Sequence, residues 1–398
     1  MLTHYLLNFL LFLLPTQLGL HFWPEQARVS GLKIDYLSPT LYLSQLVIFC
    51  LILLNLGQTI KTVKKHKVIF IYFVLLSSIN TFTSSSPLIT SYRWLEVYAL
   101  IFLGSVIYKN KKYIVKNLKF FYLGIVTVIA LQVLQVLLQS SIQGPFYWLG
   151  ERKFDFYTPS LPKVSFGNTS LLRVPSTFSH ANSLAGFVLL SFYFIKNFKP
   201  QNSFLKLISL MSLVLTFSKN SLLTLLVLSC FNLKTKLILL LCLFTTSLLI
   251  FLPRENSMPY FVSSRVEGYQ YSIEIFKQNA LFGTGLGAYI ASLGESLPAS
   301  KVDLTNLQPV HNIYLLLVSE LGLLGVVLLL LVLIKSNIRS NYNIFLNVVL
   351  ITGLFDHYWL TQIQNKLLLV VCLCLFGVKY SHDKISKSPS KYWWWFKR

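Results

Sequence analysis

Residues 308–325 read QPVHNIYLLLVSELGLLG, and the apolar residues continue to about residue 334. A run of this length is enough for a helix to cross a lipid bilayer, which takes about 20 residues. The run nevertheless starts with His311 and contains Glu320, two side chains that lipid penalises. The segment therefore predicts a membrane-spanning helix whose polar residues have specific roles.

The composition of the whole chain indicates a membrane protein. Of its 398 residues, 54% are hydrophobic and 12% are charged, whereas a soluble domain carries about 25% charged residues. We expect an all-α polytopic membrane protein, a single integral membrane domain over residues 1–398 with about 12 transmembrane helices. The expected spans are residues 2–20, 40–57, 68–83, 92–108, 118–138, 178–196, 203–217, 221–233, 236–252, 311–334, 342–355 and 363–379.

The distribution of charge predicts the orientation of these spans. The formal net charge is +22, but the basic residues cluster in short loops between apolar runs, which favours a topology signal over a nucleic-acid surface. The positive-inside rule then places both termini in the cytoplasm, with a basic cytoplasmic tail at residues 380–398. Two long loops, residues 139–177 and 253–310, would face outward, and long loops in a compact fold are usually functional.

The sequence shows no motif for a nucleotide or a metal. The glycines of GTGLG, at positions 283, 285 and 287, form neither a Walker A loop nor a dinucleotide fingerprint, so we expect a flexible turn. The five cysteines lie inside apolar segments and lack the spacing of a metal site. No cofactor is expected.

Two cations stand out because of their positions. Lys219 lies in LTFSKNSLLTLL, within residues 203–233, which are too short for two full crossings, so the tip of this hairpin should be recessed in the membrane. A lysine there is either functional or extends to the headgroups. Arg265 follows Ser264 in a capping-box pattern that predicts the start of an amphipathic helix. Its side chain would either bind an anion at that helix start or pair with Glu267.

His311 is the main candidate for proton transfer. It should lie in the first turn of its span, where a neutral imidazole can accept a proton, and Asn312 adds a donor beside it. The alternative is that His311 only caps the helix. Glu320 is nine residues further on and about half a turn out of phase, so it should contact a neighbouring helix or an inner cavity.

A second polar group surrounds another helix start. Arg173 precedes VPSTFSHANSLAG, in which residues 175–177 indicate that a helix begins. His180 and Asn182 would then either line the same outer cavity or form hydrogen bonds between helices. Asp356 and His357 are adjacent in the last outward loop, where a local ion pair or hydrogen bond is the simpler interpretation.

These segments together resemble a known family. RVPSTFSHANSLAG, LTFSKNSLLTLL, SRVEGYQYSIEIFKQNALFGTGLGAYI and HNIYLLLVSELGLLG are similar, in this order, to the signature segments of the O-antigen ligase and O-antigen polymerase family. The resemblance implies a membrane glycosyltransferase with a large outer loop over a cavity. It equates Arg265 with the family's outer-loop arginine and His311 with its loop-end histidine. Lys219 stands in S-K-N where the family has S-R-G, and Arg173 could supply the missing guanidinium.

The expected activity follows from that resemblance and from the cations. A glycan would move from undecaprenyl diphosphate to an acceptor hydroxyl at the outer face of the bacterial cytoplasmic membrane, without a metal. Lys219, Arg265 and Arg173 would hold the diphosphate, and His311 would accept the proton. The partners would be the lipid-linked donor, a glycan or lipid-linked acceptor and membrane lipid, without nucleic acid. A lipid-linked glycan flippase or permease and a protein O-glycosylating transferase remain alternatives, and ligase and polymerase are not distinguished.

Overall fold

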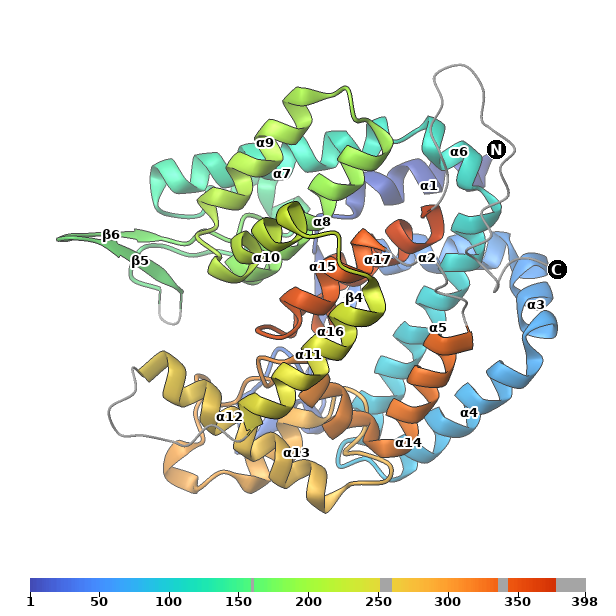
Figure 1. The fold of residues 1–398 in the computed structure, drawn as a ribbon, viewed down its shortest axis with the longest axis vertical. Coiled ribbons are helices and arrows are strands. Elements are labelled where there is room, and N and C mark those ends of the chain that lie inside the picture. Colours follow the sequence, from blue (N-terminus) through green and yellow to red (C-terminus); the bar gives the residue numbers. More distant parts are fainter. Residues whose placement is uncertain (159–160, 251–259, 336–342, 377–398) are drawn as a thin grey trace.

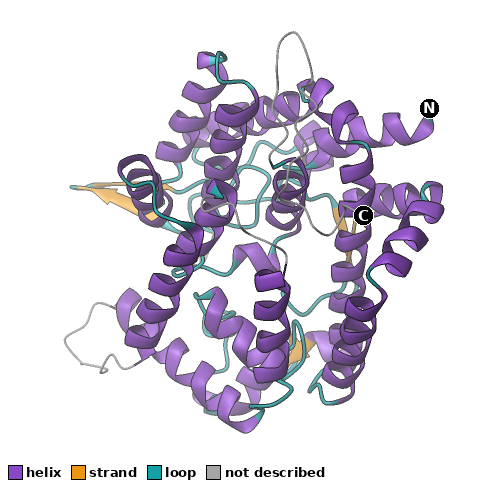
Figure 2. Ribbon diagram, turned by 45° about the vertical axis from the view of Figure 1, so that its right-hand side comes forward, coloured by secondary structure: helices purple, strands orange, loops and turns teal. Residues whose placement is uncertain are grey.

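The chain is mostly helical with few, short strands (Figures 1 and 2). The computed structural model describes residues 1–158, 161–250, 260–335 and 343–376. The predicted cytoplasmic tail at 380–398 lies outside the described residues, as do positions 253–259 of the second long loop.

The elements follow one another in a simple order. The helices are α1 (Leu2–Leu13), α2 (Leu43–Leu54), α3 (Leu56–Lys65), α4 (Lys67–Phe82), α5 (Pro87–Lys109), α6 (Lys111–Lys116), α7 (Lys119–Leu138), α8 (Ala181–Phe198), α9 (Ser203–Leu215), α10 (Lys219–Cys230), α11 (Thr235–Ile250), α12 (Tyr260–Gln278), α13 (Tyr289–Ser296), α14 (Ile313–Lys335), α15 (Ile344–Thr352), α16 (Tyr358–Thr361) and α17 (Ile363–Leu375). Antiparallel pairs form between β1 (Gly19–His21) and β4 (Thr40–Tyr42), between β2 (Arg28–Val29) and β3 (Leu32–Lys33), and between β5 (Lys163–Phe166) and β6 (Thr169–Leu172).

A few helices are long and apolar enough to span a membrane. In the described part of the chain these are Lys119–Leu138 and Ile313–Leu331, and the pair α2 and α3 would add a third if its 78° bend lies within one crossing. Other apolar helices at the positions of expected spans are shorter, between 10 and 17 residues. The twelve crossings and their direction therefore stay a prediction.

Two hydrophobic cores organise the molecule. The larger core surrounds α8, which is apolar on all sides and contacts α9, α10, α15 and α17 in the upper half of Figure 1. A helix with this pattern is stable only when other elements enclose it. The smaller core joins α12, α13 and the start of α14 to the loop that contains β2 and β3. Ile313 packs in the larger core and Leu316 in the smaller one, so the residues just before α14 lie where the cores meet.

Helix α14 is broken at Gly322, whose φ and ψ are 63° and −174°. The break frees backbone groups, and the turn at residues 280–285 satisfies them: the amide of Gly285 donates to the carbonyl of Glu320 at 3.1 Å, and that of Leu323 donates to Ala280 at 2.9 Å. Irregular backbone at membrane depth is tolerated where it is buried in protein in this way. Gly283 and Gly285 are buried, so the flexible turn predicted for GTGLG is wrong; it is a packed turn.

Asn80, on α4, holds this turn in place. Its Nδ2 donates to the carbonyls of Phe282 at 2.7 Å and Glu320 at 2.9 Å, and its Oδ1 accepts from the amide of Leu286 at 2.9 Å. The indole of Trp94 donates to the same Oδ1 at 3.0 Å. One fully buried amide thus connects α4, α5 and the broken α14.

The glycine at the break gives a test of this arrangement. A Cβ at Gly322 would lie 2.5 Å from the amide nitrogen of Gly283, in a backbone conformation that is essentially restricted to glycine. We expect Gly322→Ala to lower the free energy of unfolding by more than the roughly 1–3 kcal/mol of backbone strain alone. The matched control is Gly57→Ala on α3, where a Cβ would meet nothing within 4 Å. Thermal unfolding in detergent measures both, and equal midpoints would contradict the packing.

Candidate functional site

The Asp356 carboxylate connects three segments that are distant in the sequence. It lies between α15 and α16 with 5% of its surface exposed. Its Oδ2 accepts a hydrogen bond from Nδ2 of Asn182 at 2.8 Å, and its Oδ1 accepts from the amide of His357 at 2.9 Å. The Nδ1 of His311 lies 3.7 Å from the same Oδ1. Since a buried carboxylate must be paired, these contacts bring α8 and the start of α14 together.

Arg173 is the next member of this chain of contacts. Its Nη2 donates to Oδ1 of Asn182, and its Nε donates to the carbonyl of Thr216 at 2.9 Å, in the turn between α9 and α10. Asn182 therefore bridges the guanidinium and the Asp356 carboxylate. Within the described residues, Nη1 of Arg173 donates to no group, so part of the guanidinium is left for a ligand.

Arg265 and His311 line one cavity of about 200 Å³, together with Glu267, Tyr271 and Lys301. Glu267 forms an ion pair with Lys301, which neutralises that acid. The His311 side chain is 33% exposed, and its buried Nδ1 has no hydrogen-bond partner among the described residues, because 3.7 Å is longer than a hydrogen bond. A small closure toward Asp356 would make that bond and leave Nε2 to face the cavity.

Burial and neighbouring charges set the protonation of the cluster. Burial alone would raise the pKa of Asp356, but His311, His357 and His180 around it lower that pKa well below its usual range. Burial lowers the pKa of His357 to about 3. Burial also lowers the pKa of Arg173, and the charge of Arg265 acts in the same direction. At neutral pH the Asp356 carboxylate is therefore charged and the His357 imidazole is neutral.

The same cluster contains a set of groups that could hold a metal ion. One ligand atom each from His311, Asp356 and His357 lies within 4.8 Å of the others. Two imidazoles and a carboxylate suit zinc. Neighbouring side chains orient two of these three groups. The hydroxyl of Thr361 lies at hydrogen-bond distance, 3.0 Å, from Nδ1 of His357, and Asn182 donates a hydrogen bond to Asp356. The expectation of a metal-independent reaction remains a prediction.

Two of the predicted helix starts are wrong. Helix α12 begins at Tyr260, not at Ser264, so Arg265 lies inside the helix and not at its positive end. A serine can bond to the helix backbone in its interior without ending the helix. Helix α8 begins at Ala181, not at residues 175–177, and His180 is its N-cap, with Nδ1 accepting from the amide of Asn182 at 3.1 Å.

Asn312 has a structural role next to His311. Its Oδ1 accepts from the amides of Tyr314 at 2.9 Å and Leu315 at 3.1 Å, which caps α14, and its Nδ2 donates to the carbonyl of Leu354 at 3.2 Å. Asn312 thus ties the start of α14 to the loop that carries Asp356. His311 precedes the helix and is not in its first turn.

Glu320 and Lys219 lie outside this group of contacts. The carboxylate of Glu320 is buried beside the backbone of Gly287 and Tyr289, at the break in α14. Lys219 is the first residue of α10, and its side chain is exposed. Its neighbours fix the hairpin instead: Thr216 accepts from Arg173, and Asn220 donates to the carbonyl of Thr352 at 2.8 Å. Of these two cations, Arg173 is the one that bonds to Asn182.

Asp356 and His357 are the functional candidates that the sequence interpretation undervalued. The expected local contact exists, but Asp356 also binds Asn182 and faces His311. A carboxylate in a short loop between apolar segments was the available signal, because few acids occur in this chain and a buried one needs several partners.

Comparison with known proteins does not assign the chain to a family. Among models of known protein families none matches the chain, and no curated protein matches it. The functional assignment therefore depends on the residues and their geometry.

The lowered pKa of His357 predicts that this group does not control the pH dependence. With a pKa of about 3, His357 is already deprotonated above pH 5, so it does not change charge between pH 5 and 8. His357→Asn keeps a polar side chain near Thr361. We expect the acidic limb of its pH–activity profile to stay at the wild-type position. A limb that moves or disappears in this variant would contradict the assignment.

Proposed function

We propose that the protein is a membrane glycosyltransferase of the O-antigen ligase or polymerase type, which moves a glycan from undecaprenyl diphosphate to an acceptor hydroxyl. The observation that carries this proposal is the cavity shared by Arg265 and His311, with Asp356, Asn182 and Arg173 connected behind it. A cation and a proton acceptor on one cavity are what displacement from a diphosphate requires.

His311 acts as the general base in this reaction. When the two groups close from 3.7 Å, Asp356 accepts a hydrogen bond from the Nδ1–H of His311 and orients the ring, so that Nε2 carries the lone pair. When the acceptor oxygen bonds to the anomeric carbon of the donor sugar, its proton passes to Nε2. The bond from that carbon to the diphosphate oxygen breaks, and its electron pair leaves with the diphosphate.

Arg265 and Arg173 bind the diphosphate and stabilise the charge that develops on the leaving group. A guanidinium can bind two phosphate oxygens at once, which an ammonium cannot. This favours Arg173 over the exposed Lys219 as the second cation. The isoprenoid chain lies between helices, where apolar side chains such as Leu223, Leu226 and Leu240 are exposed on the protein surface.

The proposal includes the orientation derived from the sequence. The protein lies in the bacterial cytoplasmic membrane with about 12 crossings and both termini in the cytoplasm. Residues 139–177 and 253–310 face outward. The clustering of basic residues in short loops between apolar runs supports this orientation.

A lipid-linked glycan flippase is the alternative from another class, and protein O-glycosylation is the alternative within the enzymes. Purified protein in lipid nanodiscs is mixed with a lipid-diphosphate glycan and candidate acceptors. A covalent product supports a transferase, and the acceptor that carries it separates glycan from protein transfer. Movement of donor across proteoliposomes without product would favour the flippase.

Substitution of the base tests the mechanism. We expect His311→Ala to lower the transfer rate by about 10²–10⁴-fold, the usual contribution of a general base. The matched control is Lys219→Gln, which removes an exposed charge outside the cluster and should change the rate less than threefold or so. Thermal unfolding verifies that both variants fold. Equal rates for the two variants would remove His311 from the mechanism.

Chelation tests the metal-independence of the reaction. We expect incubation with EDTA, followed by its removal, to leave the transfer rate unchanged, because the guanidinium groups supply the positive charge. Elemental analysis of the purified protein is the second measurement. A rate that falls after chelation and returns with Zn²⁺ would assign the His311, Asp356 and His357 cluster to a metal instead.

A further inference from the structure

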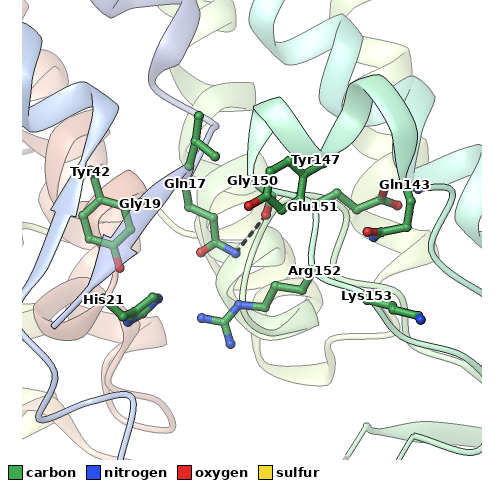
Figure 3. A pocket seen from close by; sticks show the side chains of 11 residues that line it. Gln17, Gly19, His21, Tyr42, Gln143, Tyr147, Gly150, Glu151, Arg152 and Lys153 are labelled. Carbon is green, nitrogen blue, oxygen red and sulfur yellow. Dashed lines mark hydrogen bonds between the residues drawn. The ribbon is translucent and has the colours of Figure 1, made fainter. Parts of the chain in front are cut away.

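A second cavity, of about 280 Å³, lies against the first long loop. Figure 3 shows its lining: His21 and Tyr42 come from the β1–β4 pair, Gln17 precedes β1, and Gln143 and Arg152 come from the segment 143–153. The proposed mechanism uses none of these residues. The volume is at the small end of ligand pockets, which suits a single sugar residue of a larger glycan.

The cavity wall is built by specific contacts. Glu151 is 3% exposed, and its carboxylate accepts from the amides of Ile142 at 2.8 Å and Gln143 at 2.6 Å and from Nε2 of Gln135 at 2.8 Å. Gly150 has φ +91°, and a Cβ there would lie 2.6 Å from the backbone of Gln17. These hydrogen bonds hold the Glu151 carboxylate within the wall and fix the segment 142–151 around it.

Gln143 offers an unused donor to this cavity. Its backbone has φ +64°, which is uncommon for a residue other than glycine. Strained backbone that the surroundings hold in place is typical of ligand sites. Its Nε2 is buried and has no hydrogen-bond partner among the described residues. A buried donor without an acceptor is costly, so an acceptor group on a ligand would stabilise it.

The charge of the lining favours an anionic ligand. Arg152 extends into the region between Gln17 and His21 in Figure 3. Its Nη1 is 3.2 Å from Oδ2 of Asp35, but the two side chains are 43% and 54% exposed. An ion pair this exposed is weak, so a carboxylate or phosphate on a ligand can compete for the guanidinium. Tyr42 and Tyr147 add rings against which a sugar can pack.

One short segment connects this cavity to the cluster around Asp356. Asp35 pairs with Arg152, and the next residue, Tyr36, packs edge-on against the ring of His357 with centroids 5.4 Å apart. Arg93 fixes that segment by donating from Nη2 to the carbonyl of Tyr36 at 2.7 Å. Asp35 and Tyr36, which are adjacent in the chain, therefore link the lining of the second cavity to the cluster around Asp356.

We propose that this second cavity binds an acidic sugar residue, one that carries a carboxylate or phosphate, of the acceptor glycan. The proposal rests on the proposed function, since it assigns the acceptor side of the same reaction. Arg152 binds the acid group, Gln143 donates to a ring or hydroxyl oxygen, and the tyrosines cover the apolar face of the sugar.

The experiment measures binding without transfer. His311→Ala protein in nanodiscs is titrated with a glucuronic-acid-containing disaccharide and, separately, with the corresponding neutral glucose disaccharide, by saturation-transfer NMR. We expect the acidic disaccharide to bind at least about tenfold more tightly, a difference of about 1.4 kcal/mol. Introducing Arg152→Gln into the His311→Ala protein should abolish that preference. Lys163→Gln, a charge removal on the exposed strand β5, should retain it.

The outcomes separate the two proposals. Equal binding of both disaccharides, or a preference that survives Arg152→Gln, overturns the acceptor site whether or not the wild type transfers a glycan. Selective binding that Arg152→Gln abolishes supports the site, even if no transfer is found and the proposed reaction fails. If Arg152→Gln does not fold, Gln143→Leu decides: it removes a donor to an oxygen that both disaccharides carry, so both should bind more weakly, and unchanged binding of both overturns the site.

Discussion

The buried carboxylate of Asp356 imposes the arrangement on which the site depends. A charge removed from water needs partners, and here the Asn182 side chain and the His357 amide donate hydrogen bonds to it while the His311 imidazole lies 3.7 Å away. These groups belong to three segments that are distant in the chain. The pairing that stabilises the carboxylate therefore also places Arg173, through Asn182, on one side and His311 on the other. The group that stabilises the packing is thus also the one on which the proposed reaction depends.

The break in α14 solves a similar problem for the backbone. Gly322 interrupts the helix, and the turn at 280–285 supplies the missing hydrogen bonds. That turn follows α12, which carries Arg265, and α14 itself follows His311. The interrupted helix thus fixes α12 against α14 and brings Arg265 and His311 to one cavity. Asn312 completes the link by capping α14 and bonding to Leu354, two residues before Asp356.

The sequence was informative where polar residues interrupt apolar runs. Arg173, His180, Asn182, Arg265 and His311 were all identifiable in this way, and the structure gathers them. The direction of the Lys219 side chain was not predictable, because the hairpin turn can expose its first helical residue. The capping pattern at Ser264 failed because local signals do not fix a helix start. Asp356 was undervalued because an adjacent histidine offered a sufficient local partner, whereas its long-range partners depend on tertiary packing.

The central claim is that Asp356 acts through His311. A double-mutant cycle on the transfer rate tests it most directly, with Asp356→Asn, His311→Gln and the combined variant measured at saturating donor. The account predicts strong non-additivity: once His311 is replaced, the change at Asp356 should cost little more. Fully additive losses, in which each substitution lowers the rate by the same factor in either background, would show that the two residues act independently and would contradict the account.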